Sequence, residues 1–199
     1  MSKTYKIIVA LVVIVVVGYA GWRYYESRRA AKAGLLSENI VHNGNDWVAD
    51  FTAILPAPEP EVFNAVRDIE KAHSDQIQNV KVISQTDNSK TVELEMKGMG
   101  DQTMKLQMAF QYDPAARTIS YHTIDSPNFS LSADYKFEDQ GGSTLITCHQ
   151  TTTMAQQLPL PDSAVSEVIK GVFISQLESL KRTLNIASGD EGDESNEEP

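Results

Sequence analysis

The sequence FTAILPAPEPEVFNAV at Phe51–Val66 changes its hydrophobic period where a cluster of prolines begins. Before the prolines, apolar and polar residues alternate over Asp46–Leu55, as they do in a strand with one buried face. After them, apolar residues recur at spacings of three and four over Glu59–Glu70, and the prolines and acids at its start favour a helix N-terminus. This stretch therefore predicts a strand that leads directly into a short helix.

The residues after this helix predict a series of strands joined by tight turns. Within Thr103–Tyr112, Met104 and Leu106 share one face with further apolar residues, and polar residues occupy the other face. A Gly-Gly pair at 141–142 is typical of a hairpin turn, and residues 87–89 form a second polar turn. The predicted strands are Ile77–Ser84, Thr91–Met99, Thr103–Tyr112, Arg117–Ile124, Phe129–Glu138 and Ser143–Met154.

A long amphipathic helix ends the predicted domain, and Asp162 or Ser163 can cap its N-terminus. Because strands joined in sequence order form an antiparallel meander with one apolar face, that face needs a cover. The final helix is the only predicted element long enough to provide it, so the sequence predicts an α+β fold with about seven strands. Its apolar stripe comprises Val165, Val168, Ile169, Val172, Phe173, Leu177, Leu180 and Leu184.

This order of elements resembles the helix-grip superfamily, which includes START lipid-transfer domains, the birch-pollen allergen, and polyketide cyclase-like and coenzyme Q-binding proteins. The resemblance covers about Asp46–Ile186 and is carried by Phe51–Val66, by FEDQGGSTLIT at Phe137–Thr147, and by Leu158–Leu184, which LPLP opens. It implies a curved antiparallel sheet that grips the C-terminal helix. It also implies an elongated cavity between sheet and helix that often holds an apolar ligand.

The N-terminus contains a charge-free apolar segment, Ile7–Trp22, with aromatic residues at both ends. From Tyr5 to Tyr25 a helix would span roughly 30 Å, which is close to the thickness of a hydrocarbon core. We therefore expect an uncleaved single-pass transmembrane anchor over residues 1–25. A cleaved signal peptide is the alternative, with a small-residue site at residues 18–20, but the arginines that follow oppose export.

The remaining predicted divisions follow from composition. Residues 26–45 are predicted to form a juxtamembrane helix and, over Asn39–Asp46, a turn-rich linker. Residues 46–186 form the helix-grip domain, and residues 187–199 are predicted to be a disordered acidic tail. Four basic residues after the apolar segment, against two lysines and the amino terminus before it, favour a cytoplasmic domain under the positive-inside rule.

Charge and cysteine content exclude several classes of function. The net charge of the chain is −10, and its main body is acidic, which argues against nucleic-acid binding. The chain has one cysteine, Cys148, so an intrachain disulfide and a multi-cysteine zinc site are excluded. The four histidines lack metal-ligand spacing, and nothing in the sequence predicts a metal or a cofactor.

Methionine and aromatic residues gather on one predicted sheet face, and we expect them, with one helix residue, to bind a ligand. Flexible methionines suit a pocket for apolar molecules, although an ordinary packed core requires the same alternation. Three tyrosines in the set could supply the polar contacts. The candidate residues are Met96, Met104, Met108, Phe110, Tyr112, Tyr121, Phe129, Tyr135 and Phe173.

Two classes of function follow. The first is a membrane-tethered binding or carrier module for a lipid, quinone or other hydrophobic molecule, with the membrane and that molecule as partners. The second is a cyclase, dehydratase or hydrolase, with His122 as the candidate acid or base, although the pattern favours an outer sheet face for His122. Cys148 is predicted to be a small packing residue rather than a nucleophile. A ligand-free scaffold for a protein partner remains a third option.

The first prediction concerns the anchor. Full-length protein should sediment with membranes, resist carbonate extraction and keep its original N-terminus, because Ile7–Trp22 is apolar over the length of a membrane helix. Membrane fractionation and N-terminal sequencing test this. A mature N-terminus at Gly21 would instead show a cleaved signal peptide.

Overall fold

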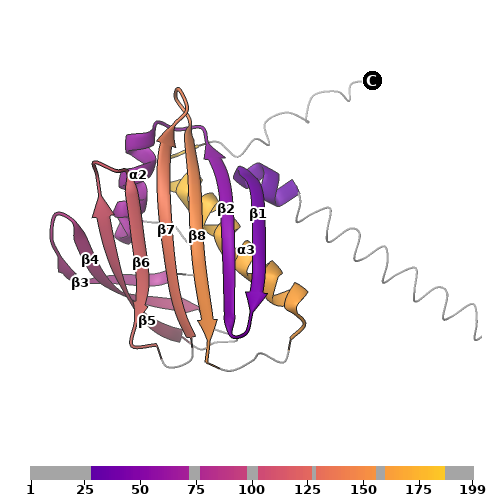
Figure 1. The fold of residues 1–199 in the computed structure, drawn as a ribbon. Coiled ribbons are helices and arrows are strands. Elements are labelled where there is room, and N and C mark those ends of the chain that lie inside the picture. The colour runs from indigo at the N-terminus through magenta and orange to yellow at the C-terminus, as the bar shows by residue number, and fades with distance from the viewer. Residues whose placement is uncertain (1–27, 72–76, 98–102, 127–128, 156–159, 187–199) are drawn as a thin grey trace, which may run out of the picture.

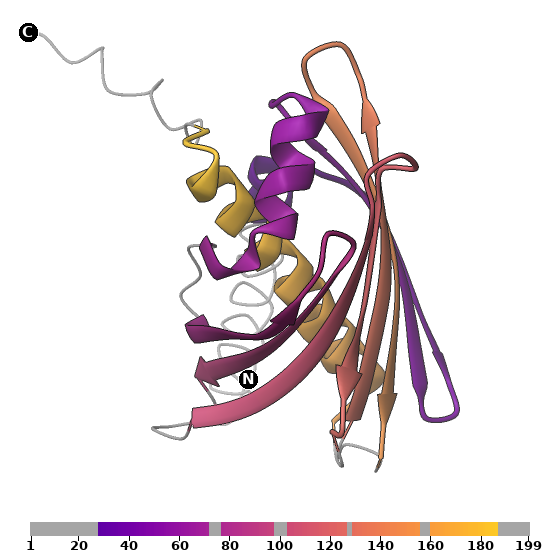
Figure 2. The same ribbon diagram turned by 90° about the vertical axis from the view of Figure 1, so that its left-hand side faces the viewer.

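The computed structural model describes residues 28–71, 77–97, 103–126, 129–155 and 160–186. In these residues one antiparallel sheet of eight strands curves around a C-terminal helix (Figures 1 and 2). Its spatial order is β1-β2-β8-β7-β6-β5-β4-β3, so β1 and β3 form the edges. The strands are β1 Leu35–Asn43, β2 Asp46–Leu55, β3 Ile77–Gln85, β4 Ser89–Lys97, β5 Thr103–Asp113, β6 Thr118–Ile124, β7 Phe129–Asp139 and β8 Thr144–Met154.

Residue alternation divides the sheet into a buried concave face and an exposed convex face. In β2, Ala49, Phe51 and Ala53 are buried, and the residues between them are less so. The first and last predicted strands lie side by side next to the β1 edge of the sheet, where Phe51 of β2 pairs in register with Cys148 of β8. This pairing joins the N-terminal hairpin to the meander, so that all eight strands share one core.

Two helices cover the concave face. Helix α2, Glu59–Arg67, follows β2 directly, as the proline-containing stretch predicts, and the short 3-10 helix η1, Ile69–Lys71, continues it. Helix α3, Asp162–Thr183, crosses the sheet on the same side (Figure 2). The predicted α+β helix-grip architecture is therefore confirmed. The predicted hairpin turn at 141–142, between β7 and β8, has both glycines at positive φ.

The number of strands differs from the prediction because β1 occupies residues that were expected to form a helix end and a linker. Residues 28–33 are helical, but the strand then begins at Leu35 and pairs with β2 as far as Asn43. The linker expected over Asn39–Asp46 is therefore wrong. Most of β1 is exposed at the sheet edge, so it lacks the apolar alternation that reveals other strands, and the turn is confined to residues 44–45.

The predicted stripe of α3 also needs correction. Val165, Ile169, Phe173 and Leu177 are buried, but Val168 is 61% exposed. Ile174, which the predicted stripe omits, is fully buried. Residues 28–33 and β1 contact α3 through Arg29 with Glu178 and Glu38 with Lys170, so α3 packs against these segments as well as against the sheet face.

Two predicted segments lie outside the described residues: the anchor, residues 1–25, and the acidic tail, residues 187–199. Within the part of the chain that the structure describes, no helix has both the length and the apolar character needed to cross a membrane.

The second prediction concerns Gly34, which lies between the 28–33 helix and β1. Its φ is 97°, and a Cβ there would overlap the carbonyl oxygen of Ile54. Gly34→Ala should therefore lower the free energy of unfolding by about 3 kcal/mol, through backbone strain and steric overlap. Chemical denaturation of the full chain measures this loss.

Gly44→Ala is the matched control for this substitution. Gly44 also has positive φ, 66°, but no atom lies within 4 Å of the added Cβ. Only the backbone strain of about 1 kcal/mol should appear. Equal losses in the two variants would contradict the close approach of Gly34 to β2.

Candidate functional site

The concave face encloses a cavity of about 300 Å³ between the sheet and α3, next to α2. Its walls are mostly apolar, and its partly exposed rim includes Val66, Ile69, Ile77 and Val172. The lining residues are Ala65, Val66, Ile69, Ile77, Leu94, Leu106, Met108, Phe110, Tyr121, Phe129, Leu131, Tyr135, Phe137, Ile146, Val172, Phe173, Ser175, Gln176, Leu177, Ser179 and Leu180.

One wall of the cavity is formed by Phe173, where α3 packs against β2 near one edge of the sheet. Phe173 stacks on Phe51 of β2, with 4.3 Å between ring centres and 8° between ring planes. Both rings are 2% exposed. The stack is worth about 0.5–1.5 kcal/mol beyond the area it buries, and it fixes the distance between helix and sheet. Phe173 therefore packs on one side and faces the cavity on the other.

A small polar cluster interrupts the apolar lining where α3 faces β6 and β7. The Tyr135 hydroxyl donates a hydrogen bond to Oε1 of Gln176 over 2.8 Å. The Tyr121 ring lies beside Tyr135, with 5.8 Å between ring centres. Burial raises the pKa of Tyr121 to about 12 and the pKa of Tyr135 well above its usual value. Both phenols therefore keep their protons at neutral pH.

A buried lysine holds the α2–η1 corner that forms part of the rim. The Lys90 side chain is 1% exposed and forms an ion pair with Glu70 over 2.7 Å. Its ammonium group also donates to the backbone carbonyl of Arg67 over 3.0 Å, and the Tyr112 hydroxyl donates to the same oxygen over 3.4 Å. These bonds satisfy a carbonyl at the end of α2 and position Ile69 at the cavity.

The structure places the predicted candidate residues in three groups. Six of them line the cavity: Met108, Phe110, Tyr121, Phe129, Tyr135 and Phe173. Tyr112 is buried, but it lies at the end of α2 rather than in the lining. Met96 and Met104 pair in register on β4 and β5, and the positions of their side chains lie outside the described part of the chain.

Sequence reasoning missed the contributions of α2 and the polar residue on α3. Val66 and Ile69 follow the apolar spacing of the first helix, but they were not connected to a pocket. Gln176 lies three residues after Phe173 and one before Leu177. This spacing places it on the apolar side of α3 and indicates a partly buried polar residue there. A polar residue within an apolar stripe is a usable signal because a buried amide requires a partner.

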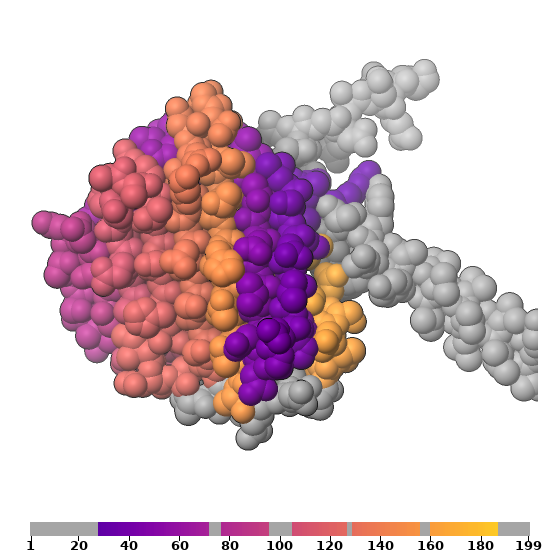
Figure 3. Space-filling view, in the orientation of Figure 1, coloured from indigo at the N-terminus to yellow at the C-terminus, as the bar shows by residue number. Residues whose placement is uncertain are grey.

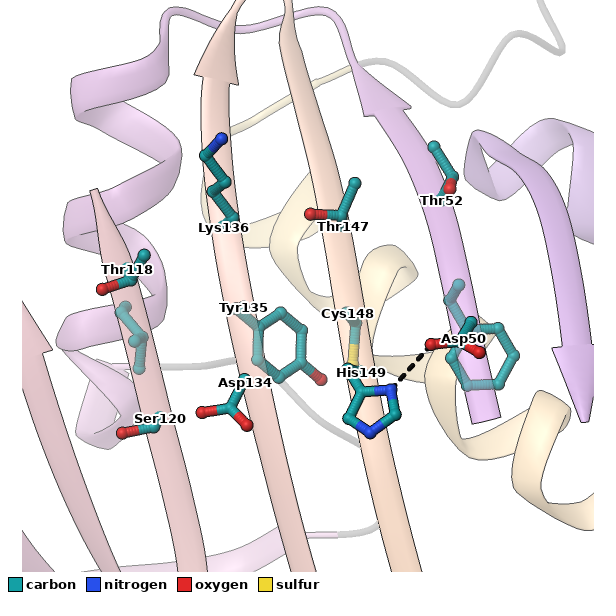
Figure 4. A pocket seen from close by; sticks show the side chains of 12 residues that line it. Asp50, Thr52, Thr118, Ser120, Asp134, Tyr135, Lys136, Thr147, Cys148 and His149 are labelled. Atoms are coloured by element: carbon teal, nitrogen blue, oxygen red, sulfur yellow. Dashed lines mark hydrogen bonds and ion pairs between the residues drawn. The ribbon is translucent and has the colours of Figure 1, made fainter. Parts of the chain in front are cut away.

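The convex face of the sheet, which faces the viewer in Figure 3, has a second, open hollow lined mostly by polar side chains of β2, β6, β7 and β8 (Figure 4). Nδ1 of His149 lies 2.7 Å from a carboxylate oxygen of Asp50, and both side chains are 55% exposed. Asp134 stands opposite His149 in register, and His122 is exposed on the same face. Because these groups are well solvated, they form an ordinary polar surface.

Neither a nucleophile nor a metal site emerges from the described residues. Cys148 is buried on the concave side, and burial raises the pKa of its thiol to about 12, which disfavours the reactive thiolate. No group of three or more His, Cys, Asp or Glu side chains in these residues is arranged to hold a metal ion.

Comparison with known proteins agrees with this architecture. A family model described as polyketide cyclase/dehydrase and lipid transport matches residues 47–185, and the chain belongs to this family. A comparison with curated protein sequences gives no significant match.

Solved structures share the fold at low sequence identity. The Zhui aromatase/cyclase from Streptomyces sp. R1128 is 16% identical with a TM-score of 0.59, over 75% of this chain and 95% of that chain. A START superfamily protein from Mycobacterium smegmatis is 16% identical with a TM-score of 0.59, over 70% and 99%. Ara h 8.0201 is 19% identical with a TM-score of 0.56, over 70% and 99%. At these identities the likeness shows the fold alone.

The third prediction tests whether Phe173 both packs and lines the cavity. Phe173→Ala should lower the free energy of unfolding by about 3 kcal/mol, the lower end of the range for a buried phenylalanine, because the ring is 2% exposed and stacks on Phe51 but also borders the cavity. Denaturant unfolding measures the change.

Val168→Ala, on the exposed side of the same helix, should change the free energy of unfolding by less than about 0.5 kcal/mol. A loss of about 5 kcal/mol at Phe173 would indicate that the ring is enclosed on all sides.

Proposed function

We propose that this chain binds a hydrophobic small molecule in the cavity between the sheet and α3 and acts as a carrier or binding module. The observation that supports this most directly is the cavity itself, which is lined by aliphatic, methionine and aromatic side chains. Its volume of about 300 Å³ lies at the lower end of the range of small-molecule sites. The ligand is therefore smaller than a complete two-chain membrane lipid.

The chemistry of the polar cluster favours binding over proton transfer. A general base must release and accept a proton near neutral pH. Burial raises the pKa values of Tyr121 and Tyr135, so that both hydroxyls stay protonated there and act as hydrogen-bond donors. Among the described lining residues none has a side chain that serves as a base near neutral pH, whereas binding needs only the apolar and hydrogen-bonding groups of this lining.

We further propose that the apolar segment Ile7–Trp22 tethers the cavity to a membrane, where hydrophobic ligands are concentrated. The helix at residues 28–33 would connect this tether to the domain, and it is held against α3 by the following contacts. Arg29 forms a bidentate ion pair with Glu178 of α3 at 2.7 and 2.8 Å. Lys181 of α3 donates to the backbone carbonyl of Lys32. Few residues separate the apolar segment from this clasp, which limits how far the domain could lie from the bilayer.

The fourth prediction tests occupancy of the cavity with a bulky residue at its rim. Val172 lines the cavity and is 36% exposed. Val172→Trp should obstruct the cavity and weaken binding of the neutral fluorophore N-phenyl-1-naphthylamine at least about tenfold. A fluorescence titration of the full chain measures this, and mass spectrometry of organic extracts from the purified native chain should reveal a bound apolar compound.

Val168→Trp is the control because Val168 lies one helical turn earlier on α3, is 61% exposed and does not line the cavity. It adds the same apolar ring to the surface and should leave fluorophore binding unchanged. Equal binding by both variants would locate the fluorophore outside the cavity and count against this function.

A further inference from the structure

Basic side chains gather where the 28–33 helix packs on the last turns of α3. Arg29 forms its bidentate ion pair with Glu178 there, and Lys181 donates to the backbone carbonyl of Lys32. These contacts bring together bases from the two ends of the described chain. We call this group the basic patch, and it comprises Arg28, Arg29, Lys32, Lys181 and Arg182. In a chain with a net charge of −10, such a concentration of positive charge is a distinct electrostatic feature.

The 28–33 helix presents part of the basic patch to solvent. Ala30 and Ala33 are 7% and 1% exposed, so their side of the helix packs on the domain. Arg28 and Lys32 are exposed, and residues four apart share one face of a helix. The helix therefore buries its alanines and keeps these two bases on the opposite face.

An exposed leucine follows the basic patch in the chain. Leu36 is 59% exposed, and the register of β1 on β2 shifts between Leu35 and Ser37, so a bulge leaves Leu36 outside the paired ladder. Only four residues separate it from Lys32. An exposed apolar side chain close to basic ones is typical of a surface that meets a membrane, because the bases attract lipid phosphates and the apolar group enters the acyl boundary.

The place of the basic patch in the chain limits its distance from the proposed membrane segment. Six residues lead from Trp22 to Arg28, and even a fully extended chain covers at most about 3.6 Å per residue. In the proposed tethered state, Arg28 therefore lies within about 22 Å of the membrane end of that segment. The tether holds the basic patch near the headgroups.

We propose that the basic patch and Leu36 dock on the headgroup layer of that membrane and recognise anionic phospholipids. This inference rests on the proposed tether and names the surface of the domain that meets the bilayer. The phosphate oxygens accept charge-assisted hydrogen bonds from the arginines and lysines, and Leu36 enters the boundary between headgroups and acyl chains.

The acidic C-terminal residues are the other candidate occupant of the basic patch. Residues 187–199 begin five positions after Arg182 and contain six acids, so their charge is complementary to the patch. They contain no Val, Ile, Leu, Met or aromatic residue, however, and cannot cover the exposed side chain of Leu36 with apolar surface. The leucine beside the bases therefore favours a lipid surface.

A label at position 36 tests docking in the full chain reconstituted into vesicles. Leu36→Cys, labelled with the environment-sensitive fluorophore nitrobenzoxadiazole, reports entry into the headgroup region, and Cys148 is only 3% exposed, so the label attaches at position 36. We expect the emission to be at least about twofold higher in vesicles of phosphatidylcholine and phosphatidylglycerol than in pure phosphatidylcholine. Salt at about 1 M, where the Debye length is about 3 Å, should abolish this difference.

Charge reversals assign the docking to the basic patch. In the labelled chain, Arg28→Glu or Lys32→Glu should remove most of the difference between the two kinds of vesicle, while the emission in neutral vesicles stays unchanged. Lys81→Glu is the matched control, because it alters the net charge equally and Lys81 is exposed on β3, at the sheet edge opposite β1. It should keep the difference, and an equal loss in Lys81→Glu would overturn the assignment to the patch.

The outcomes separate this inference from the functions proposed above. Flotation of the chain with neutral vesicles tests the tether by itself. When the chain floats, equal emission in both kinds of vesicle would overturn the docking and leave the tether and the cavity intact. A difference that appears only after residues 187–199 are removed would show that these residues occupy the patch, and would also overturn it. Failure to float would overturn the tether and this inference together, whereas cavity binding is decided by the V172W comparison.

Discussion

The concave face of the sheet presents more apolar surface than one helix can cover, and most of the structure follows from that mismatch. Helix α3 makes close contact where Phe173 stacks on Phe51. Beyond this contact, β3, β4 and β5 curl towards the helix without closing on it (Figure 2). The apolar residues between them, including Met108 and Phe110, are shielded by curvature and by α2 rather than by direct helix packing. A cavity is the consequence, because side chains on a curved sheet cannot all reach a straight helix.

Ion pairs with a buried partner hold both ends of α2, which contributes residues to the rim of the cavity. These pairs, and not only apolar packing, fix the position of the helix. At one end of α2, Glu59 forms an ion pair with Arg117 over 3.2 Å, and the Arg117 guanidinium lies 5.5 Å from the centre of the Phe63 ring. Phe63 in turn meets Phe137, a cavity residue, edge to face. At the other end Lys90 holds the last turn of α2. Loss of the Glu59–Arg117 pair or of the Lys90 contacts would leave a buried charge unpaired, so α2 has one favoured position.

Local periodicity was sufficient to predict most of the sheet, both helices of the domain and six of the nine candidate cavity residues by position. It failed where position depends on distant segments. Strand β1 has no buried face of its own and forms because β2 offers its edge. Ile174 is fully buried, and Ser175 and Glu178 beside it on α3 contact Arg29, more than a hundred positions earlier in the chain, which no spacing within α3 reveals. Tyr112 lies on the apolar face of β5, as a lining residue does. Because α2 packs against this position, the Tyr112 hydroxyl donates to the backbone carbonyl of Arg67 instead of lining the cavity.

Helix α3 connects the two properties that the proposed function needs. Along one side, Phe173, Gln176 and Leu177 line the cavity. Arg29 donates hydrogen bonds to Ser175, which also lines the cavity, and to Glu178, which does not. Residues that line the cavity therefore alternate along α3 with a residue that holds the 28–33 helix. The family shares the fold with proteins of several chemistries, so the apolar lining of the cavity, rather than the fold, favours a hydrophobic ligand.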